Sequence, residues 1–399
     1  MIPMMPKSAG PSPTGSPSLR RAPRRRIPSP LPRLLLAALL LRGPVDASAA
    51  AAAGGGGGAI SLTPAERRQL AALVESDPEA RKLYQKVRKE ADSHLGAAGN
   101  PAPTLHTAGR VATDPEKIAS KASLEDMKRL HALGYTFAVT GTPAYAEASR
   151  RIILAWARVN QPTGLPIDET KLEPLLTTYD LTRSTFSSEE RSTVDDWLRR
   201  LAQAELRTGE TNSVTSFNNW NSHRVKLVGL IGLLLEDKSL SDEALRKFRR
   251  QIEANLKPDG SSYDFHERDA LHYHCYDLEP LLALAIAARR SGLDLYHYES
   301  PSGSSLAKSV AFLLPYCDGT KTHAEWVHSN VKFDRTRAEA GEKGFTPGEL
   351  FQPREARATL ELASAFDPAC RGAALRLQEN GAARFAGWTM VVNKVREHP

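Results

Sequence analysis

Apolar residues recur every three or four positions through most of the chain, which is the spacing of one face of an α-helix. The segment 63–75 opens with Thr63 as an N-cap, Pro64 at the first helical position and Glu66 placed to complete a capping box. Thr142 stands in the same way before a proline and a second periodic run. These patterns predict helices that begin where a cap and a proline coincide.

Further amphipathic patterns predict helices over 187–206, 241–256 and 353–366, and no segment alternates convincingly as a half-buried strand does. About ten to twelve helices with short connections favour antiparallel pairs arranged around an axis. The predicted fold is all-α, an incomplete (α/α) toroid. It is expected to form one domain over residues 62–399, after an Ala/Gly-rich linker at 50–61.

The chain has 53 Lys and Arg residues against 46 Asp and Glu residues, a formal net charge of +7. Eight of the basic residues and one of the acidic residues fall within residues 1–49, so the rest of the chain is neutral overall. The basic balance belongs to the N-terminal segment and does not indicate a nucleic-acid partner. A local basic cleft is still compatible with it.

The N-terminal segment has the composition of a targeting sequence. A basic region precedes the apolar run at 34–41, and Ala47, Ser48 and Ala49 form a small-residue cleavage site. We expect residues 1–49 to be a signal peptide and the mature protein to be periplasmic or secreted. The Arg- and Ser-rich composition also fits an organelle transit peptide. No later run reaches the roughly 18 apolar residues of a membrane span, so none is expected in the mature protein.

Cysteine usage argues against a disulfide scaffold. The three cysteines are Cys275, Cys317 and Cys370, too few for such a scaffold and spaced unlike a zinc site. Either Cys317 and Cys370 form a bridge after export, or all three are unpaired core thiols; the second interpretation is slightly favoured. No metal site and no cofactor are predicted.

The sequence SFNNWNSHR at 216–224 precedes a strongly apolar run. If a helix begins near Asn219, then Asn219 and His223 share one face and Asn218 is an N-cap. Capping does not require the other polar residues. Amide donors beside an imidazole at a helix N-terminus favour an anion, so the cluster indicates a binding site. The alternative for His223 is a satisfied core histidine.

A second cluster lies in DFHERDALHYHCYDLEPLLALA, at 264–285. On a helix, leucines and a cysteine form an apolar stripe, whereas His272, Tyr273, Tyr276 and Asp277 lie on the other side. The two tyrosines are about 60° apart. A solvated helix face more commonly carries Lys and Glu. The pattern therefore indicates a cleft, with an aromatic–polar packing network as the alternative.

The second cluster resembles the alginate lyase family of polysaccharide lyases, whose hallmark is A-L-x-Y-H-x-Y-x-L-x-P-L. The chain matches it without a gap through Ala270, Leu271, Tyr273, His274, Tyr276, Leu278, Pro280 and Leu281. Asn218 and Asn219 resemble the family's N-N-H motif at the appropriate distance upstream. The resemblance covers roughly residues 105–320.

The resemblance implies an α/α toroid and β-elimination on uronate polysaccharides. The C5 proton of a uronate is a poor acid until the neighbouring carboxylate is neutralised by Asn, Arg or His. A base then removes that proton, and an acid protonates the departing O4. The resemblance assigns the tyrosine of this chemistry to Tyr273, with Tyr276 as the second candidate.

Two positions depart from the family pattern. Trp220 stands where the family has a histidine directly after the paired asparagines, and His223 is a candidate substitute three residues on. His266 stands where the family has an arginine, seven residues before Tyr273, and Arg268 is the nearest arginine. These departures indicate a divergent branch and leave linkage preference and the identity of the base open.

The prediction is an exported lyase that binds an anionic polysaccharide, with the oligomeric state left open. The predicted catalytic residues are Asn219, His223, Arg268 and Tyr273. The predicted substrate-binding residues are Asn218, Trp220, His266, His272, His274, Tyr276 and Trp326. Trp326 suits a subsite wall, or is simply a packed tryptophan.

Two other functions stay open. A glycoside hydrolase on the same toroid would need paired carboxylates; the candidates are Asp264, Glu267, Asp269, Asp277 and Glu279. A non-catalytic polysaccharide-binding protein would keep the cleft and lack the chemistry, and the missing family histidine favours it.

Overall fold

Caps and prolines mark the helix starts in the computed structural model. Thr63 Oγ1 accepts from the Glu66 amide at 3.2 Å, and the Glu66 carboxylate accepts from the Thr63 amide at 2.7 Å, so the predicted capping box is present. Another helix begins at Pro143 as predicted, but Thr142 makes no capping hydrogen bond. The proline itself, with its fixed φ and missing N–H, suits that start.

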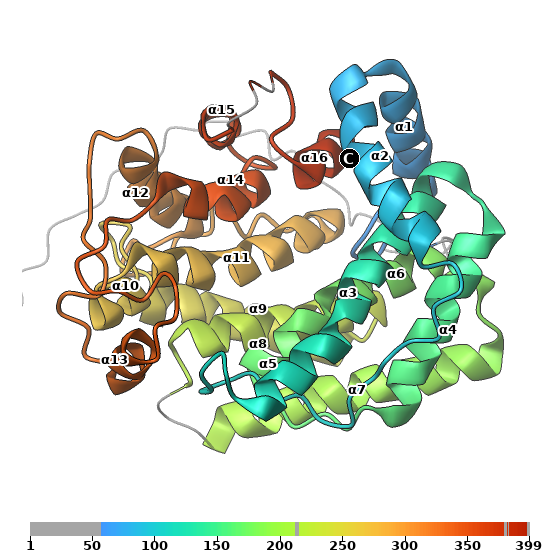
Figure 1. Ribbon diagram of the computed structural model, residues 1–399, viewed down its shortest axis with the longest axis horizontal. Helices are drawn as coiled ribbons and strands as arrows, with labels where there is room; N and C mark the ends of the chain where they lie inside the picture. Colours follow the sequence, from blue (N-terminus) through green and yellow to red (C-terminus); the bar gives the residue numbers. More distant parts are fainter. Residues whose placement is uncertain (1–56, 212–214, 379–380, 382, 397–399) are drawn as a thin grey trace, which may run out of the picture. The chain divides into compact units, whose positions relative to one another are not determined.

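The structure describes residues 57–211, 215–378, 381 and 383–396, and in this part of the chain it contains helices and isolated β-bridges but no strand. The elements, most of them labelled in Figure 1, are α1 (Pro64–Ser76), α2 (Pro78–Ser93), α3 (Pro115–Thr140), α4 (Pro143–Val159), α5 (Pro166–Glu169), η2 (Thr170–Leu172), α6 (Glu173–Thr182), η3 (Arg183–Thr185), α7 (Ser188–Thr211), α8 (Asn219–Leu234), α9 (Lys238–Asn255), α10 (Tyr263–Arg268), α11 (Leu271–Ala288), η4 (Arg289–Ser291), α12 (Leu306–Cys317), α13 (Lys332–Glu339), η5 (Pro353–Ala356), α14 (Arg357–Ala363), α15 (Pro368–Arg376) and α16 (Trp388–Arg396).

Helices that follow one another in sequence pack as neighbours. α3 packs against α2, α4 and α6, α8 packs against α7, α9 and α11, and α14 packs against α11 and α15, while α16 returns to α1 (Figure 1). This arrangement confirms the predicted all-α toroid.

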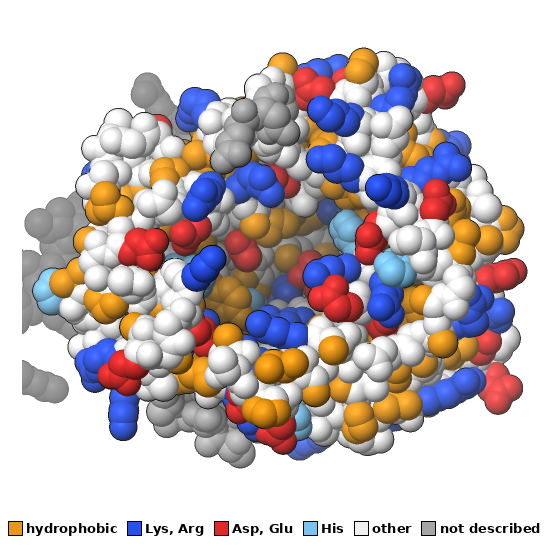
Figure 2. All heavy atoms as spheres, viewed as in Figure 1, with side chains coloured by type: hydrophobic (Ala, Val, Ile, Leu, Met, Phe, Trp, Pro, Cys, Tyr) orange, Lys and Arg blue, Asp and Glu red, His pale blue; other side chains and the backbone are white. Residues whose placement is uncertain are grey.

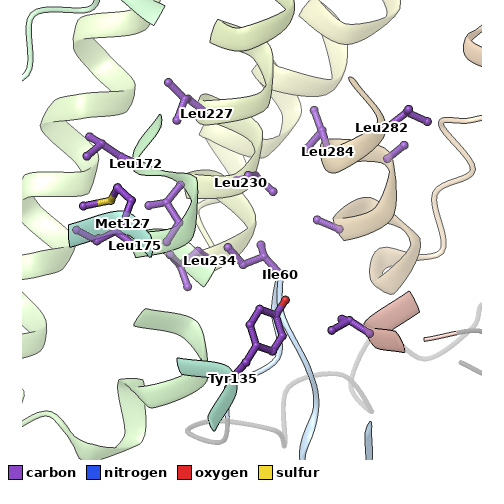
Figure 3. Packing of buried hydrophobic residues seen from close by; sticks show 14 of the residues in the cluster. Ile60, Met127, Tyr135, Leu172, Leu175, Leu227, Leu230, Leu234, Leu282 and Leu284 are labelled. Carbon is purple, nitrogen blue, oxygen red and sulfur yellow. The ribbon is translucent and has the colours of Figure 1, made fainter. Parts of the chain in front are cut away.

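Helix α8 is the most deeply buried element, and 14 of its 16 residues are buried. A helix that is enclosed on all sides needs close partners. Gly232 permits one such approach, because a Cβ at this position would lie only 2.7 Å from the backbone nitrogen of Ser241 in α9. The apolar second half of α8 therefore forms part of the central core, in which Leu227, Leu230 and Leu234 appear in Figure 3.

Residues 58–61 are held by one buried carboxylate. The backbone amides of Gly58, Ala59, Ile60 and Ser61 donate to Asp180 of α6 at 2.8–3.3 Å, and the Ser61 hydroxyl donates at 2.7 Å. Figure 3 shows Ile60 inserted near the hydroxyl end of Tyr135. These residues, which the sequence pattern assigned to the linker, are part of the fold. The predicted signal peptide lies outside the described residues.

The three cysteines are all free and buried, in line with the favoured interpretation of unpaired core thiols. In the part of the chain that the structure describes, no helix is both long enough and apolar enough to cross a bilayer.

Asp180 provides a test of the attachment of residues 58–61. Asp180→Asn should lower the free energy of unfolding by about 2–4 kcal/mol, because an amide group presents a donor to several buried N–H groups and loses the charge that they solvate. Chemical denaturation measures the change. Asp196→Asn, which disrupts an exposed ion pair with Arg199, is the matched control and should stay within about 0.5 kcal/mol. If Asp180→Asn and Asp196→Asn changed the free energy of unfolding equally, this role for Asp180 would be contradicted.

Candidate active site

A cleft of about 440 Å³ opens at the N-terminal ends of α8 and α11, beside the first half of α3. Figure 2 shows a hollow between α3 and α11, with Lys, Arg and His side chains around it and Asp or Glu side chains among them. The described residues that line the cleft are Thr107, Ala108, Gly109, Arg110, Lys117, Lys121, Ile167, Lys171, Asn219, Trp220, Arg268, His272, Tyr273, Tyr276, Phe333 and Arg337.

Six of these lining residues are Lys or Arg, and none is Asp or Glu. The three arginines have acidic partners outside the lining. Arg110 pairs with Asp114 at 2.9 Å, Arg337 pairs with Glu342 at 2.8 Å, and Arg268 pairs with Asp334. The carboxylates thus anchor the guanidinium groups without joining the lining, and the charged side chains of the lining are all cationic.

The lysines are less constrained. Lys117 Nζ donates to the carbonyl of Arg110 at 2.5 Å, and no ion pair holds Lys121 or Lys171 within the described residues. Loss of hydration lowers the pKa of both Lys117 and Lys171, and the neighbouring lysines, Lys226 first among them, lower that of Lys171 further. The crowded positive charges favour an anionic ligand between them.

Tyr273 lies on the first turn of α11, and its ring contacts a cation and a second aromatic ring. The guanidinium of Arg268 sits over its ring at 3.8 Å from the centroid, and Trp326 packs edge-on at 5.7 Å. Burial raises the pKa of Tyr273, while the cation of Arg268 opposes the shift. Its hydroxyl makes no hydrogen bond to any described residue, so it is available to a ligand in the cleft.

The start of α11 is fixed by a remote carboxylate. Ala270 has no capping side chain, and Glu325 instead accepts from the amides of Leu271 and His272 at 2.8 and 3.1 Å. Burial raises the pKa of Glu325 to about 7. Since these first N–H groups are already satisfied, the cleft attracts anions through its side-chain cations rather than through this helix end.

The paired asparagines have different tasks. Asn218 is the N-cap of α8, and its side-chain oxygen accepts from the Trp220 amide at 3.1 Å. Asn219 donates one amide hydrogen to the buried Asp264, which also accepts from Asn255 at 2.8 Å. An amide carries two hydrogens, and only one of those of Asn219, which lines the cleft and is 1% exposed, has a partner among the described residues. The third asparagine, Asn221, instead donates to Gln251 at 2.7 Å.

His223 is buried behind Tyr276 and does not line the cleft. Its Nδ1 lies 2.8 Å from the hydroxyl of Thr170, and its ring centroid is 4.4 Å from that of Tyr276. Nε2 has no partner among the described residues. Burial, together with Lys226 and Lys171, holds the pKa of His223 well below its usual value, so the ring is neutral.

The structure therefore brings part of the predicted site together. Asn219, Arg268 and Tyr273 line the cleft with Trp220, His272 and Tyr276. Outside its lining are His223 and the predicted binding residues Asn218, His266, His274 and Trp326.

The predicted binding residues outside the cleft have structural partners. His266 contacts the Ser261 hydroxyl at 2.8 Å. Trp326 is 4% exposed and packs on Tyr273 and Phe345. His274 lies between the Ser262 hydroxyl and the Ser309 carbonyl, each at 2.9 Å.

Several cleft residues were not predicted: Arg110, Lys117, Lys121, Lys171 and Phe333. Arg337 belongs to the segment 321–337, whose cations the sequence suggested for a subsite wall. Lys117 and Lys121 are four residues apart and share a helix face, which is a weak signal because solvated helix faces often carry such pairs. Within the described residues, no group of three His, Cys, Asp or Glu side chains is placed to hold a metal ion.

Comparison with known proteins identifies the family. A family model described as alginate lyase matches residues 65–350, well over half of the chain. The chain belongs to the alginate lyase family. Two curated relatives come from Stenotrophomonas maltophilia: a polysaccharide lyase, 27% identical over 43% of this chain and 54% of its own length, and an alginate lyase, 26% identical over 41% and 24%. The matches span about half the length of the first relative and a quarter of the second.

Solved alginate lyase structures share the fold. An alginate lyase from Bacteroides ovatus superposes with a TM-score of 0.60 at 16% identity, covering 82% of this chain and 97% of that one. A tyrosine-to-phenylalanine variant of alginate lyase A1-III, in complex with a tetrasaccharide, superposes at 0.59 with 19% identity, covering 77% and 88%. At these identities the likeness concerns the fold alone.

His274 of the family hallmark gives a pH-dependent prediction. Burial lowers its pKa to about 4, against about 6.5 in an unfolded chain. Below pH 6.5 His274 becomes protonated in the unfolded state but stays neutral in the folded state. The free energy of unfolding therefore falls as the pH drops toward 4. Between about pH 7 and about pH 4.5 this histidine should account for a loss of about 2 kcal/mol.

Denaturant unfolding at the two pH values tests this account. His274→Gln, which cannot titrate in this range, should lose less stability than the unaltered protein on acidification. His297→Gln, which replaces an exposed histidine beside Asp294, should follow the unaltered protein. If His274→Gln lost as much stability on acidification as the unaltered protein, the assignment would be refuted.

Proposed function

We propose that the protein is a polysaccharide lyase that cleaves a uronate-containing polysaccharide, alginate or a related polyuronate, by β-elimination. Family membership supports this activity. The observation that carries the proposal is the joint presence of Asn219, Arg268 and Tyr273 in one cationic cleft without a lining carboxylate. These side chains provide neutralisation of a carboxylate and an acid–base hydroxyl, the two requirements of the reaction.

Carboxylate neutralisation falls to Asn219 and Arg268. Asn219 is anchored through Asp264, so its second amide hydrogen has a fixed direction. Arg268 is anchored through Asp334. As the C5 proton leaves, charge moves onto the substrate carboxylate, and donors that are already oriented need no reorganisation to stabilise it.

Proton transfer falls to Tyr273 in this proposal. As the phenolate, Tyr273 takes the C5 proton; the electron pair of that bond forms the C4–C5 double bond and the C4–O4 bond breaks. The tyrosine hydroxyl then returns a proton to O4, which leaves as an alcohol and restores the phenolate. Burial raises the pKa of Tyr273, and Arg268 over the ring partly offsets this by favouring the phenolate.

His223 and Trp220 take other parts in the proposal. His223 is neutral and has no access to the cleft, so it is assigned to the support of Tyr276 rather than to proton transfer. Trp220 lines the cleft in place of the family histidine, and its indole is suited to stacking on a sugar ring.

The two rival functions are less well supported. Of the five carboxylates considered for a hydrolase, none lines the cleft among the described residues, whereas a glycoside hydrolase requires two beside the scissile bond. A binding protein without turnover is favoured only by Trp220, which replaces the family histidine.

A panel of alginate, glucuronan, hyaluronan and chondroitin tests the proposal. Elimination leaves a C4–C5 double bond in the product, and its ultraviolet absorbance should rise with at least one polymer. New reducing ends without this absorbance would indicate hydrolysis. Binding without turnover on every polymer would establish a binding protein.

Tyr273→Phe should lower the rate on the best polymer by about 10²–10⁴, since a positioned acid–base group is lost. The ring contacts with Arg268 and Trp326 persist, so the melting temperature should change little. Tyr276→Phe is the matched control, one helical turn away, and should have a milder effect. An inactive Tyr276→Phe beside an active, folded Tyr273→Phe would move the chemistry to Tyr276, and full activity in both would refute the mechanism.

We further propose export to the periplasm or the medium, supported by the leader composition. The mature protein should begin near Ala50, and N-terminal sequencing of the exported protein locates the cleavage. An active protein that stays in the cytoplasm with its leader intact would contradict export.

A further inference from the structure

One lysine of the cleft is anchored by buried neighbours and has a side chain that is open to a ligand. Lys171 is the middle residue of η2, which packs against α3 and α8 and so belongs to the α3 side of the hollow in Figure 2. Its neighbours Thr170 and Leu172 are 6% and 0% exposed, whereas Lys171 is exposed and lines the cleft. Of these three residues, Lys171 alone therefore reaches the hollow.

A line of contacts connects η2 to the two tyrosines of α11. The hydroxyl of Thr170 lies 2.8 Å from Nδ1 of His223. The ring centroid of His223 is 4.4 Å from that of Tyr276, which is 5.9 Å from that of Tyr273. The side chain of Lys171 thus begins one residue away from this line, and Lys171 and Tyr273 line the same cleft from different helices.

The surroundings of Lys171 favour its neutral amine. Loss of hydration lowers the pKa of Lys171, and the cation of Lys226 lowers it further. Asp168 opposes the shift, whereas Lys117 and Lys121 add to it. Asp168 is 1% exposed, and one of its oxygens already accepts from two backbone amides and a hydroxyl at 2.6–2.7 Å. A lysine in such a place is suited to accept a proton.

Two uronates that differ only at C5 make different demands on a lyase. In mannuronate, the C5 proton and O4 lie on the same face of the sugar ring, so Tyr273 is able to exchange both protons. In guluronate they lie on opposite faces, and one side chain does not reach both. Elimination at guluronate therefore requires a base that stands across the ring from the acid.

Apart from Tyr273, five side chains of the described lining are able to accept a proton: Lys117, Lys121, Lys171, His272 and Tyr276. His272 and Tyr276 lie on α11, as Tyr273 does. Lys117 already donates to a backbone carbonyl at 2.5 Å. Lys121 and Lys171 remain, and Lys171 is the one beside the line of contacts that reaches Tyr273.

We propose that Lys171 is a second base in the cleft, which removes the C5 proton of guluronate while Tyr273 protonates O4. This inference rests on the proposed lyase function and extends it to a second linkage. It gives the cleft two proton-transfer routes, one through Tyr273 alone for mannuronate and one through Lys171 and Tyr273 together for guluronate.

The second route balances in atoms and charge. The neutral amine of Lys171 takes the C5 proton and becomes an ammonium. The electron pair of the C5–H bond forms the C4–C5 double bond, the C4–O4 bond breaks, and the hydroxyl of Tyr273 gives its proton to O4. Burial, which raises the pKa of Tyr273, favours the hydroxyl that this step needs. The ammonium then releases a proton to water, and the phenolate takes one from water.

Turnover of polymannuronate and polyguluronate, followed by the ultraviolet absorbance of the new double bond, tests the proposal. The unaltered protein should cleave both polymers. Lys171→Arg keeps the positive charge but cannot act as a base, so the rate on polyguluronate should fall by about 10²–10⁴ while the rate on polymannuronate changes little. Lys121→Arg is the matched control and should change both rates by the same factor.

A cation that only binds the polymer would give a different result. If Lys171→Arg kept its turnover of polyguluronate, or lowered both rates equally, Lys171 would be a binding residue and the proposal would fail. If Lys171→Arg does not fold, Lys171→Ala decides. Added ethylamine should then restore cleavage of polyguluronate, and the absence of any restoration would overturn the proposal.

The same measurements separate this inference from the function on which it rests. Cleavage of polymannuronate without cleavage of polyguluronate by the unaltered protein would leave the lyase standing and overturn the second base. Cleavage of neither polymer, and of no other uronate polymer in the panel above, would refute the lyase and the second base together.

Discussion

The arrangement of the cleft depends on the buried carboxylate of Asp264. It is 2% exposed, and burial raises its pKa, while amide hydrogen bonds from Asn219 and Asn255 oppose the shift. A carboxylate removed from water requires such partners. Asn219 begins α8 and Asn255 ends α9, so Asp264 fixes α10 against both helices. Four residues later Arg268 ends α10, close to the cleft.

The turn after α10 carries this constraint to Tyr273. Asp269 adopts a left-handed backbone with φ of 49°, which ends α10 and lets α11 start two residues on. The Asp269 carbonyl accepts from the Trp326 amide at 2.8 Å, and this brings Trp326 against the ring of Tyr273. Asp264, Asp334 and Glu325 thus together set the relative positions of the amide, the guanidinium and the hydroxyl in the cleft.

Sequence patterns predicted the parts of this arrangement that are local. The start of α8 at Asn219 and the separation of Tyr273 and Tyr276 from the apolar side of α11 both follow from helical spacing. Burial of the polar side chains could not be predicted in this way. His274 and Asp277 lie on faces that another helix covers, and their partners, Ser309 and Ser222, are 35 and 55 residues away in sequence. His223 is placed by Thr170 in the same manner.

The cationic lining of the cleft could not be predicted from the sequence either, because it too depends on residues that are distant along the chain. Its lysines and arginines come from segments as far apart as Arg110 and Arg337, and the net charge of the chain outside the leader is zero. Acidic partners such as Asp334 and Glu342 are not part of the described lining. The field in the cleft is therefore positive although the domain is neutral, a separation of charge that depends on tertiary structure and that composition cannot reveal.

The crowding of the lysines also couples anion binding to protonation. The pKa values of Lys117 and Lys171 are lowered by lost hydration and by other cations. A carboxylate placed between them reverses the electrostatic part of that shift, because an opposite charge favours the protonated amine. By linkage, a polyanion binds more tightly when the lysines are protonated, and its binding draws a proton from solution where they are not. The arginines do not take part in this exchange, since guanidinium stays charged throughout. Arg268 therefore supplies a constant, anchored charge in the cleft, whereas Lys117 and Lys171 supply charges that respond to pH and to a bound anion.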